Sequence, residues 1–340
     1  MPESFDAIAS DIARYQARTI PGYANLCRRR GVDSRHIQRA RDAPAVPTDL
    51  FKLTRVSTFS AEEAVATFRT SGTTEGQNTR GAHAFRTLAT YDANALAFGK
   101  RSLLGAHGEK VPFLVFGPPP SESSESSLMH MINLFAAHWA SECTYLIERG
   151  TLNLEVLSEK CAQFGVDATP SVVVLGTSFA FVHFLDGLDG ATMPLPKQSR
   201  VMHTGGFKGK SRTVAPDALL QGLANAFAIA PTRIVSEYGM TELSSQFYEH
   251  LLVDTKAKRG IFFEPPWARI VPVDAETLLP VAEGETGIAR IEDLANVDSA
   301  FAIVTQDRVR RVDGGFQLLG RAPGAEARGC SIAIDEMLGG

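Results

Sequence analysis

The segment Val111-Pro112-Phe113-Leu114-Val115-Phe116, with Gly117-Pro118-Pro119-Pro120 directly after it, decides the fold class. An apolar run that ends at a glycine and three prolines is typical of a short buried strand followed by a loop. The pattern returns in residues 171–176 and, in shorter form, in residues 200–203 and 233–235. Strands that are apolar throughout, rather than at alternate residues, indicate a sheet that is covered on both faces.

Between these strands, apolar residues recur at helical spacing. Helices are predicted over residues 128–138, 152–164 and 215–227. Strand, loop and helix in alternation predict an α/β fold with a largely parallel sheet flanked by helices. In such sheets, ligands bind in the loops that follow the carboxyl ends of the strands. We therefore expect the functional residues in those loops.

The two ends of the chain differ from this centre. Phe5, Ile8 and Ile12 lie at helical spacing, and Pro21 begins a second predicted helix. From residue 260 onward, short strands with turn signals predict a smaller β-rich subdomain. We expect an N-terminal helical segment over residues 1–45, an α/β core over residues 46–259 and the β-rich subdomain over residues 260–340.

The composition restricts the class of protein. Apolar residues make up 44% of the chain, charged residues 21%, and the net charge is −4. These values are typical of a globular protein with a buried core, and they predict no nucleic-acid partner. No apolar run is long enough to span a bilayer, and the first residues lack the pattern of a signal peptide. The four cysteines form no Cys-x-x-Cys pair, so we expect a reduced, cytoplasmic protein.

The strongest functional signal is Thr70-Ser71-Gly72-Thr73-Thr74-Glu75-Gly76. Glycines let the backbone approach an anion, and successive N–H groups with nearby hydroxyls form a nest for phosphate oxygens. The same composition is also typical of a surface turn. Taken alone, the segment leaves both interpretations open.

A second phosphate-binding candidate is Thr204-Gly205-Gly206-Phe207-Lys208-Gly209-Lys210-Ser211. It lies between a predicted strand and a predicted helix, and Gly209-Lys210-Ser211 matches the end of a P-loop, although Thr204 stands where the first glycine belongs. In that interpretation, Ile332-Ala333-Ile334-Asp335-Glu336 supplies a metal-binding strand. A P-loop NTPase or phosphotransferase is therefore the alternative function.

Two further segments follow predicted strands. In Ser236-Glu237-Tyr238-Gly239-Met240-Thr241-Glu242, the Tyr238 ring can lie against a base and the Glu242 carboxylate can hold Mg²⁺. The alternative is a helix that begins with Thr241 as its cap. Thr305-Gln306-Asp307 precedes Gly320-Arg321, where Asp307 can accept ribose hydroxyls and Arg321 can pair with phosphate. The alternative here is an Asp–Arg ion pair that holds a hairpin.

In this order, the segments resemble the motifs of the adenylate-forming superfamily: a Ser-Gly-Thr-Thr-Gly phosphate loop, Tyr-Gly-x-Thr-Glu, a ribose-binding Asp and a Gly-Arg. Within the superfamily, the chain is similar to the acyl-protein synthetase (LuxE) family. Additional likenesses are Pro47-Thr48-Asp49-Leu50-Phe51-Lys52 and the segment from Gly320 to Ser331. The departures are the inserted Glu75, Arg80 near the place of the usual Lys, and an end at Gly340 that leaves no room for the superfamily's mobile C-terminal domain.

The resemblance implies that a carboxylic acid is activated by ATP to acyl-AMP, with release of pyrophosphate, and that the acyl group then passes to a thiol. The nucleotide-binding residues that it implies are Ser71, Gly72, Thr73, Thr74, Gly76, Gly205, Gly206, Tyr238, Gly239, Asp307 and Arg321. Thr241 is expected at the α-phosphate and Glu242 at Mg²⁺. Lys208 or Lys210 is expected to replace the missing positive charge.

By the same resemblance, Cys330 is the candidate acyl acceptor, with Arg328 close enough to lower its pKa. A buried cysteine that serves only for packing is the alternative. Coenzyme A, a carrier protein and a partner reductase are the other candidate acceptors or partners. The sequence does not identify the acid. A non-catalytic protein that kept the fold is the third class of function that remains open.

Overall fold

The computed structural model describes residues 4–71, 80–105, 110–165, 171–205, 214–322 and 328–338. The chain forms two units, each assembled from separate segments. The first unit contains Met1–Asn94, Met240–Gln246 and Ile261–Gly340, and the second contains Ala95–Gly239 and Phe247–Gly260. The boundary between the units therefore falls inside the predicted Tyr238–Glu242 motif. The three domain ranges expected from the sequence stay predictions.

The second unit is built on a mainly parallel sheet with strand order β11-β10-β9-β8-β4-β5. Strands β5, β4, β8, β9 and β10 run parallel, and β11 is antiparallel to β10. The bounds are β4 Val111–Phe116, β5 Ala140–Tyr145, β8 Val173–Thr177, β9 Arg200–Thr204, β10 Ile234–Tyr238 and β11 Phe247–Glu249. The buried strands predicted from their apolar runs are present, and β10 continues through Tyr238.

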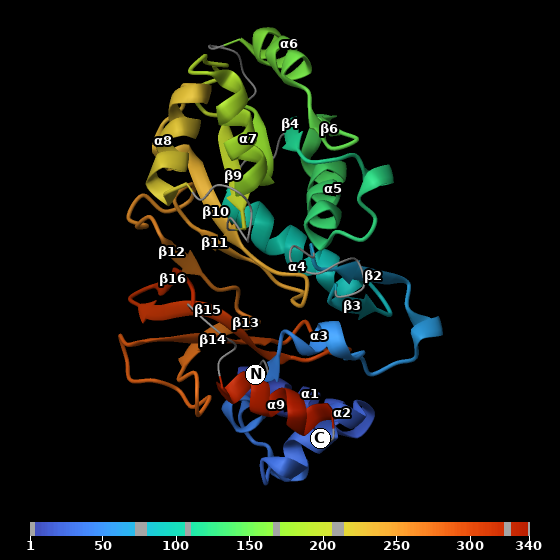
Figure 1. The fold of residues 1–340 in the computed structure, drawn as a ribbon. Coiled ribbons are helices and arrows are strands. Elements are labelled where there is room, and N and C mark those ends of the chain that lie inside the picture. The colour runs from blue at the N-terminus through green and yellow to red at the C-terminus, as the bar shows by residue number, and fades with distance from the viewer. Residues whose placement is uncertain are drawn as a thin grey trace. The chain divides into compact units, whose positions relative to one another are not determined.

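Helices cover both faces of this sheet. Figure 1 shows α7 and α8 on one side of the strands and α5 on the other. The α7 and α8 face buries a cluster that includes Phe116, Phe181, Phe184 and Phe227. The bounds are α4 Ala89–Gly99, η5 Lys100–Leu104, η6 Pro120–Glu122, α5 Ser127–Trp139, β6 Ile147–Glu148, β7 Thr151–Leu152, α6 Leu154–Phe164, α7 Ser178–Leu188, α8 Pro216–Phe227 and η7 Pro231–Arg233. α4 begins in the first unit and ends in the second.

The first unit contains an antiparallel sheet with strand order β13-β14-β15-β16-β12. Its strands are β12 Ile261–Phe263, β13 Ala268–Val273, β14 Thr286–Asp293, β15 Ala302–Val312 and β16 Gly315–Arg321. The short strand β1 (Val46–Pro47) pairs with β15 in parallel. β15 has 11 residues and contains Asp307, so the prediction that Asp307 follows a strand is wrong. Gly315 is required here, since a Cβ at this position would lie 2.2 Å from the carbonyl oxygen of Phe262.

A hairpin and a group of helices complete the first unit. The hairpin joins β2 (Ala66–Arg69) to β3 (Ala82–Phe85). The helices and turns are α1 Phe5–Thr19, α2 Pro21–Arg29, η1 Ser34–His36, η2 Ala40–Asp42, α3 Leu50–Leu53, η3 Ala61–Glu63 and α9 Arg328–Leu338. α9 lies beside α2 (Figure 1), where the Arg30 Nε donates to the Glu336 carboxylate at 2.5 Å. The two predicted N-terminal helices are confirmed as α1 and α2.

Two structural findings bear on the alternatives. Residues 332–336, which the P-loop interpretation required as a strand, lie in helix α9. That interpretation therefore loses its metal-binding strand. Separately, in the described part of the chain, no helix has the length and apolar character that crossing a membrane requires.

Candidate functional site

The predicted phosphate loop begins where β2 ends. The Thr70 N–H donates to the Gly81 carbonyl at 2.9 Å, and the Gly81 N–H donates to the Thr70 hydroxyl, also at 2.9 Å. These bonds join Thr70, at the start of the motif segment, to Gly81, which lies beyond its end. Ser71 is exposed at its start, and Arg80 Nε donates to the Thr70 carbonyl at 2.6 Å. The rest of the predicted loop (Gly72, Thr73, Thr74, Glu75 and Gly76) lies outside the described residues.

Gly205 follows β9 at the carboxyl edge of the second unit's sheet. It is exposed and has φ +75°, a conformation that favours glycine. The Ser178 hydroxyl donates to the Gly205 carbonyl at 2.8 Å and lies 3.0 Å from Nδ1 of His203. Burial lowers the pKa of His203 to about 4, so the ring is neutral at pH 7. Gly206, Lys208 and Lys210 lie outside the described residues.

Tyr238 and Gly239 end β10 in the same unit. Tyr238 is buried, and its ring centroid lies 6.0 Å from that of Phe247. The preceding residue, Glu237, is buried on β10 and its carboxylate accepts a hydrogen bond from the Thr204 hydroxyl. Burial raises the pKa of Glu237 to about 7. Sequence reasoning missed this group, although a Glu directly before the Tyr-Gly pair was visible in the motif.

Thr241 and Glu242 lie in an irregular turn of the first unit, so Thr241 does not cap a helix as one interpretation expected. Thr241 is half-buried and Glu242 is 7% exposed. Nδ1 of His83 lies 2.8 Å from the carbonyl oxygen of Thr241. Nδ2 of Asn296 donates to the carbonyl oxygen of Glu242, also at 2.8 Å. Two side chains from distant segments thus hold consecutive carbonyl groups of the motif.

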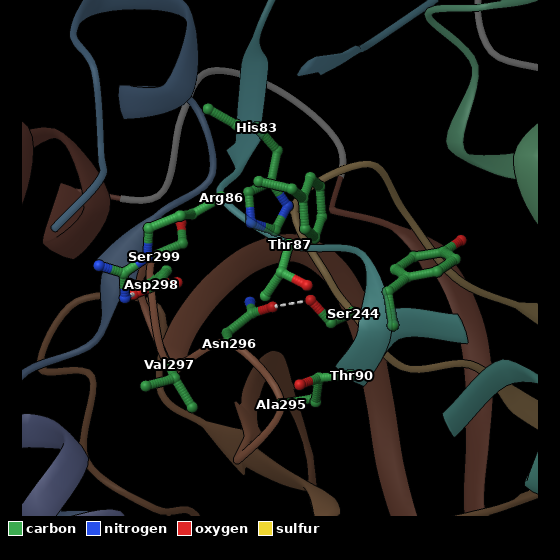
Figure 2. A pocket seen from close by; sticks show the side chains of 13 residues that line it. His83, Arg86, Thr87, Thr90, Ser244, Ala295, Asn296, Val297, Asp298 and Ser299 are labelled. Atoms are coloured by element: carbon green, nitrogen blue, oxygen red, sulfur yellow. Dashed lines mark hydrogen bonds and ion pairs between the residues drawn. The ribbon is translucent and has the colours of Figure 1, made fainter. Parts of the chain in front are cut away.

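A cavity of about 40 Å³ lies beside these two side chains (Figure 2). Its wall includes His83, Ser244 and Asn296, and Figure 2 shows the hydrogen bond from the Ser244 hydroxyl to the Asn296 amide oxygen, which is 2.6 Å long. Arg86 and Asp298 form an ion pair at 2.8 Å on the same wall. Sequence reasoning named none of these residues, because no local pattern distinguishes them.

Asp307 and Arg321 face each other across β15 and β16. They are partners in the strand register, and Nε of Arg321 lies 3.4 Å from Oδ1 of Asp307. The Asp307 side chain is 17% exposed and that of Arg321 is 57% exposed. The structure brings these two predicted residues together. Their contact is also the Asp–Arg ion pair that the alternative interpretation expected to hold a hairpin. Their roles at ribose and phosphate stay predictions.

Cys330 lies in α9 and is 3% exposed. It belongs to an apolar cluster that includes Ile12, Val273 and Phe301. The position of the Arg328 side chain is outside the described part of the chain. The burial that the packing interpretation expected is present, and the acceptor role stays a prediction.

Comparison with known proteins adds the family. Residues 6–339 match the family model described as acyl-protein synthetase, LuxE. The chain is also similar to the long-chain-fatty-acid–luciferin-component ligase of Vibrio harveyi. The two are 21% identical over 342 residues, which cover 95% of this chain and 85% of that protein.

The fold is similar to those of solved ligases. An open 2-hydroxyisobutyryl-CoA ligase in complex with 2-HIB-AMP and CoA matches with a TM-score of 0.66 and 11% identity, over 95% of this chain and 75% of that one. ATP-bound MatB from Rhodopseudomonas palustris matches with a TM-score of 0.54 and 14% identity, over 78% of this chain and 49% of that one. The predicted fold is therefore confirmed.

The family match decides between the functions that the sequence left open. It covers nearly the whole chain, whereas the P-loop interpretation rested on one short segment and on a strand that the structure shows as helix. The P-loop alternative is not favoured. The chain belongs to the acyl-protein synthetase (LuxE) family and is an ATP-dependent, acyl-adenylate-forming ligase.

Proposed function

We propose that the turn at Thr241 and Glu242 is the centre of the adenylation site and that the acid is a long-chain fatty acid. The observation that carries the first part is the geometry of this turn. After strand β10 the family motif continues as an irregular turn, not a helix. The carbonyl groups of Thr241 and Glu242 in this turn are held by the buried side chains of His83 and Asn296. The acid is proposed from the likeness to the long-chain-fatty-acid–luciferin-component ligase of Vibrio harveyi.

In the first reaction, an oxygen of the fatty-acid carboxylate attacks the α-phosphorus of ATP. A new C(O)–O–P bond forms, the bond from the α-phosphorus to the bridging oxygen breaks, and pyrophosphate leaves with the electron pair. Because charge is redistributed over phosphoryl oxygens, catalysis depends mainly on positioning and on electrostatic stabilisation. We assign Thr241 to the α-phosphate, Asp307 to the ribose hydroxyls and Arg321 to phosphate or ribose.

Glu242 fits the usual way in which proteins bind Mg²⁺ beside a phosphate substrate. Mg²⁺ prefers oxygen ligands, and is commonly bound through one or two carboxylates together with substrate phosphates. In the described part of the chain, no three His, Cys, Asp or Glu side chains gather into a metal site of protein ligands alone. Glu242 would hold the ion, which when bound neutralises charge on the phosphates.

In the second reaction, a thiolate attacks the acyl carbonyl, the bond from the acyl carbon to the AMP oxygen breaks, and AMP leaves. We propose Cys330 as the first acceptor. Because its side chain is 3% exposed within an apolar cluster, the proposal requires α9 to leave its present position before transfer. Coenzyme A and a carrier-protein thiol are the competing acceptors. Intact-protein mass spectrometry after incubation with ATP, Mg²⁺ and hexadecanoate separates them, because an acyl adduct that persists in Cys330→Ser rules Cys330 out.

The test of the first reaction is ATP–pyrophosphate exchange with a panel of aliphatic, hydroxylated, amino and aryl acids. We expect exchange that depends on long-chain fatty acids. Glu242→Gln is expected to lower the exchange rate by about 100-fold or more while the protein stays folded, as for other removed transition-state contacts. Exchange by Glu242→Gln at the wild-type rate would contradict the metal assignment, and exchange with aryl acids only would contradict the fatty-acid assignment.

A further inference from the structure

We propose that His83 and Asn296 are positioning residues for adenylation, because together they fix the backbone on both sides of the Glu242 α-carbon. The inference rests on the proposed function of Thr241 and Glu242. The Thr241 carbonyl belongs to the peptide plane that precedes Glu242, and the Glu242 carbonyl belongs to the plane that follows it. Holding both carbonyls therefore restricts φ and ψ of Glu242, and with them the direction in which its carboxylate leaves the backbone.

His83 provides the first of the two contacts from strand β3. It is 2% exposed, and its ring packs against Phe51 and Phe85 with centroid distances of 5.8 and 4.2 Å. Burial lowers the pKa of His83 to about 4, so the ring is neutral at pH 7. Since a carbonyl oxygen only accepts, the proton of the neutral ring must be on Nδ1, which lies 2.8 Å from the Thr241 oxygen.

Asn296 provides the second contact from the segment after β14. Its Nδ2 donates to the carbonyls of Glu242 and Ala300 at 2.8 and 3.1 Å, and its Oδ1 accepts from the Ser244 hydroxyl at 2.6 Å. The two carbonyls require the NH₂ group and the Ser244 hydroxyl donates to the oxygen, so the amide has a single satisfactory orientation. Figure 2 shows Ser244 and Asn296 turned toward each other. The Ser244 hydroxyl thus orients the amide that holds Glu242.

The segment that carries these contacts is itself anchored. Asp293 accepts from the Ser244 N–H at 3.0 Å and from the Ser245 hydroxyl at 2.8 Å. Nε2 of Gln16 donates to the Asn296 carbonyl at 2.8 Å. Asp293, Asn296, Ser244 and Gln16 are each at most 2% exposed. Rotating any one of these side chains would leave a buried polar atom without a hydrogen bond, which costs free energy. The hydrogen bonds of the group therefore hold one another in place.

The experiment compares His83→Leu with His83→Asn. The leucine and asparagine side chains have nearly the same shape, but only asparagine has an amide N–H that can replace the Nδ1–H donor of His83. In ATP–pyrophosphate exchange with hexadecanoate, we expect His83→Leu to lower kcat about tenfold and to raise the Mg²⁺ concentration for half-maximal rate, with the KM for the acid little changed. His83→Asn is expected to recover most of the loss.

Ser244→Ala gives an independent variant if His83→Leu does not fold. It deletes the hydroxyl that donates to the Asn296 amide oxygen and leaves both carbonyl contacts of the amide nitrogen in place. It is therefore expected to raise the Mg²⁺ requirement in the same direction by a smaller factor. Thr90→Val is the matched control, because Thr90 is exposed and lines the same cavity (Figure 2), whereas the two carbonyl contacts come from His83 and Asn296. Circular dichroism and thermal melting verify that each variant is folded.

The outcomes separate this inference from the function on which it rests. If Glu242→Gln loses exchange but folded His83→Leu and Ser244→Ala keep the wild-type kcat and Mg²⁺ dependence, the positioning role is wrong and the site assignment stands. If Glu242→Gln keeps full exchange, the site assignment is wrong and the positioning role falls with it. Equal losses in His83→Leu and His83→Asn, with no change in Mg²⁺ dependence, would reduce His83 to a packing residue.

Discussion

At the scale of single residues, Glu237 has the most consequential environment. Its carboxyl group is 6% exposed on β10, and burial raises its pKa from 4.5 to about 7. A raised pKa in the folded state means that the neutral carboxyl is the form the fold favours. The corresponding stability is fully present below about pH 4.5 and is lost as the pH rises through about 7.

We therefore predict that Glu237→Gln flattens the dependence of stability on pH. The shift from 4.5 to about 7 corresponds to about 3 kcal/mol of unfolding free energy that the wild type loses between these pH values. Glutamine keeps the shape and stays neutral. Urea unfolding of both proteins at pH 5.5 and 8 measures the difference, with the exposed Glu159→Gln as control. Identical pH profiles for wild type and Glu237→Gln would show that the carboxyl is not titrating in this range.

At the scale of elements, helix α9 is the segment on which thiol chemistry depends. It buries Cys330, and the Arg30–Glu336 pair ties it to α2 at 2.5 Å, with side chains that are 28% and 17% exposed. Weakening this pair lowers the free energy required to undock α9. Because the ion pair is partly exposed, the change is about 1 kcal/mol or less. Opening of α9 is then more frequent without loss of the whole fold.

We predict that Glu336→Gln speeds alkylation of Cys330 by iodoacetamide by up to about fivefold, the equivalent of about 1 kcal/mol. Peptide mass spectrometry separates Cys330 from the other cysteines. Asp335→Asn removes the same charge from an exposed position on the same helix and serves as the control. An unchanged rate at Cys330 in Glu336→Gln would mean that the ion pair does not hold α9 in place.

Strand β13 is the outer strand of the first unit's sheet in the described chain, and its outward groups are occupied by the protein itself. The Ile270 N–H donates to Glu264 at 2.5 Å, and Nη1 of Arg311 donates to Glu264 at 2.6 Å and to the Ile270 carbonyl at 3.3 Å. Pro272 has no N–H, and its carbonyl accepts from Val281 at 3.1 Å. Covered edges of this kind prevent pairing with a strand of another molecule.

We predict that Glu264→Ala destabilises the protein by about 1–3 kcal/mol, because it leaves a backbone N–H and a guanidinium without their shared acceptor. It should also increase association at high protein concentration, measured by static light scattering. Glu283→Ala is the control, because Glu283 is exposed and lines a groove formed in part by residues 269–272 of β13. Monomeric behaviour of Glu264→Ala at every concentration would contradict the protective role.

At the scale of the whole molecule, ligand binding couples to folding. A ligand that binds only the native state adds about 2.7 kcal/mol to the unfolding free energy at 100 times its dissociation constant. We predict that ATP raises the unfolding temperature of the wild type and that Mg²⁺ adds to the shift. In Glu242→Gln the ATP shift should persist while the Mg²⁺ increment is lost. The same Mg²⁺ increment in both proteins would exclude Glu242 as a ligand.

The sequence by itself determined the elements whose signal is local. The apolar runs predicted β4, β8, β9 and β10, since a strand buried on both faces needs apolar residues throughout. Helical spacing predicted α1, α5 and α8, and contiguous motifs identified the family. Among the helices that were not predicted is α7, which was hidden in one apolar stretch. Its start signal is the side chain of Thr177, which accepts from the Ala180 N–H, and only the strand that precedes it makes this cap recognisable.

Only the tertiary structure decided which distant residues meet. His83 and Thr241 are 158 positions apart, and Asn296 and Glu242 are 54 apart. Neither contact leaves a periodic trace in the sequence, because each depends on how β3 and the segment after β14 are placed within the first unit. The burial that shifts the pKa of Glu237 and encloses Cys330 has the same origin. The sequence gives the chemical type of each side chain, but its solvent exposure and its partners depend on how the folded chain packs, and these set its pKa.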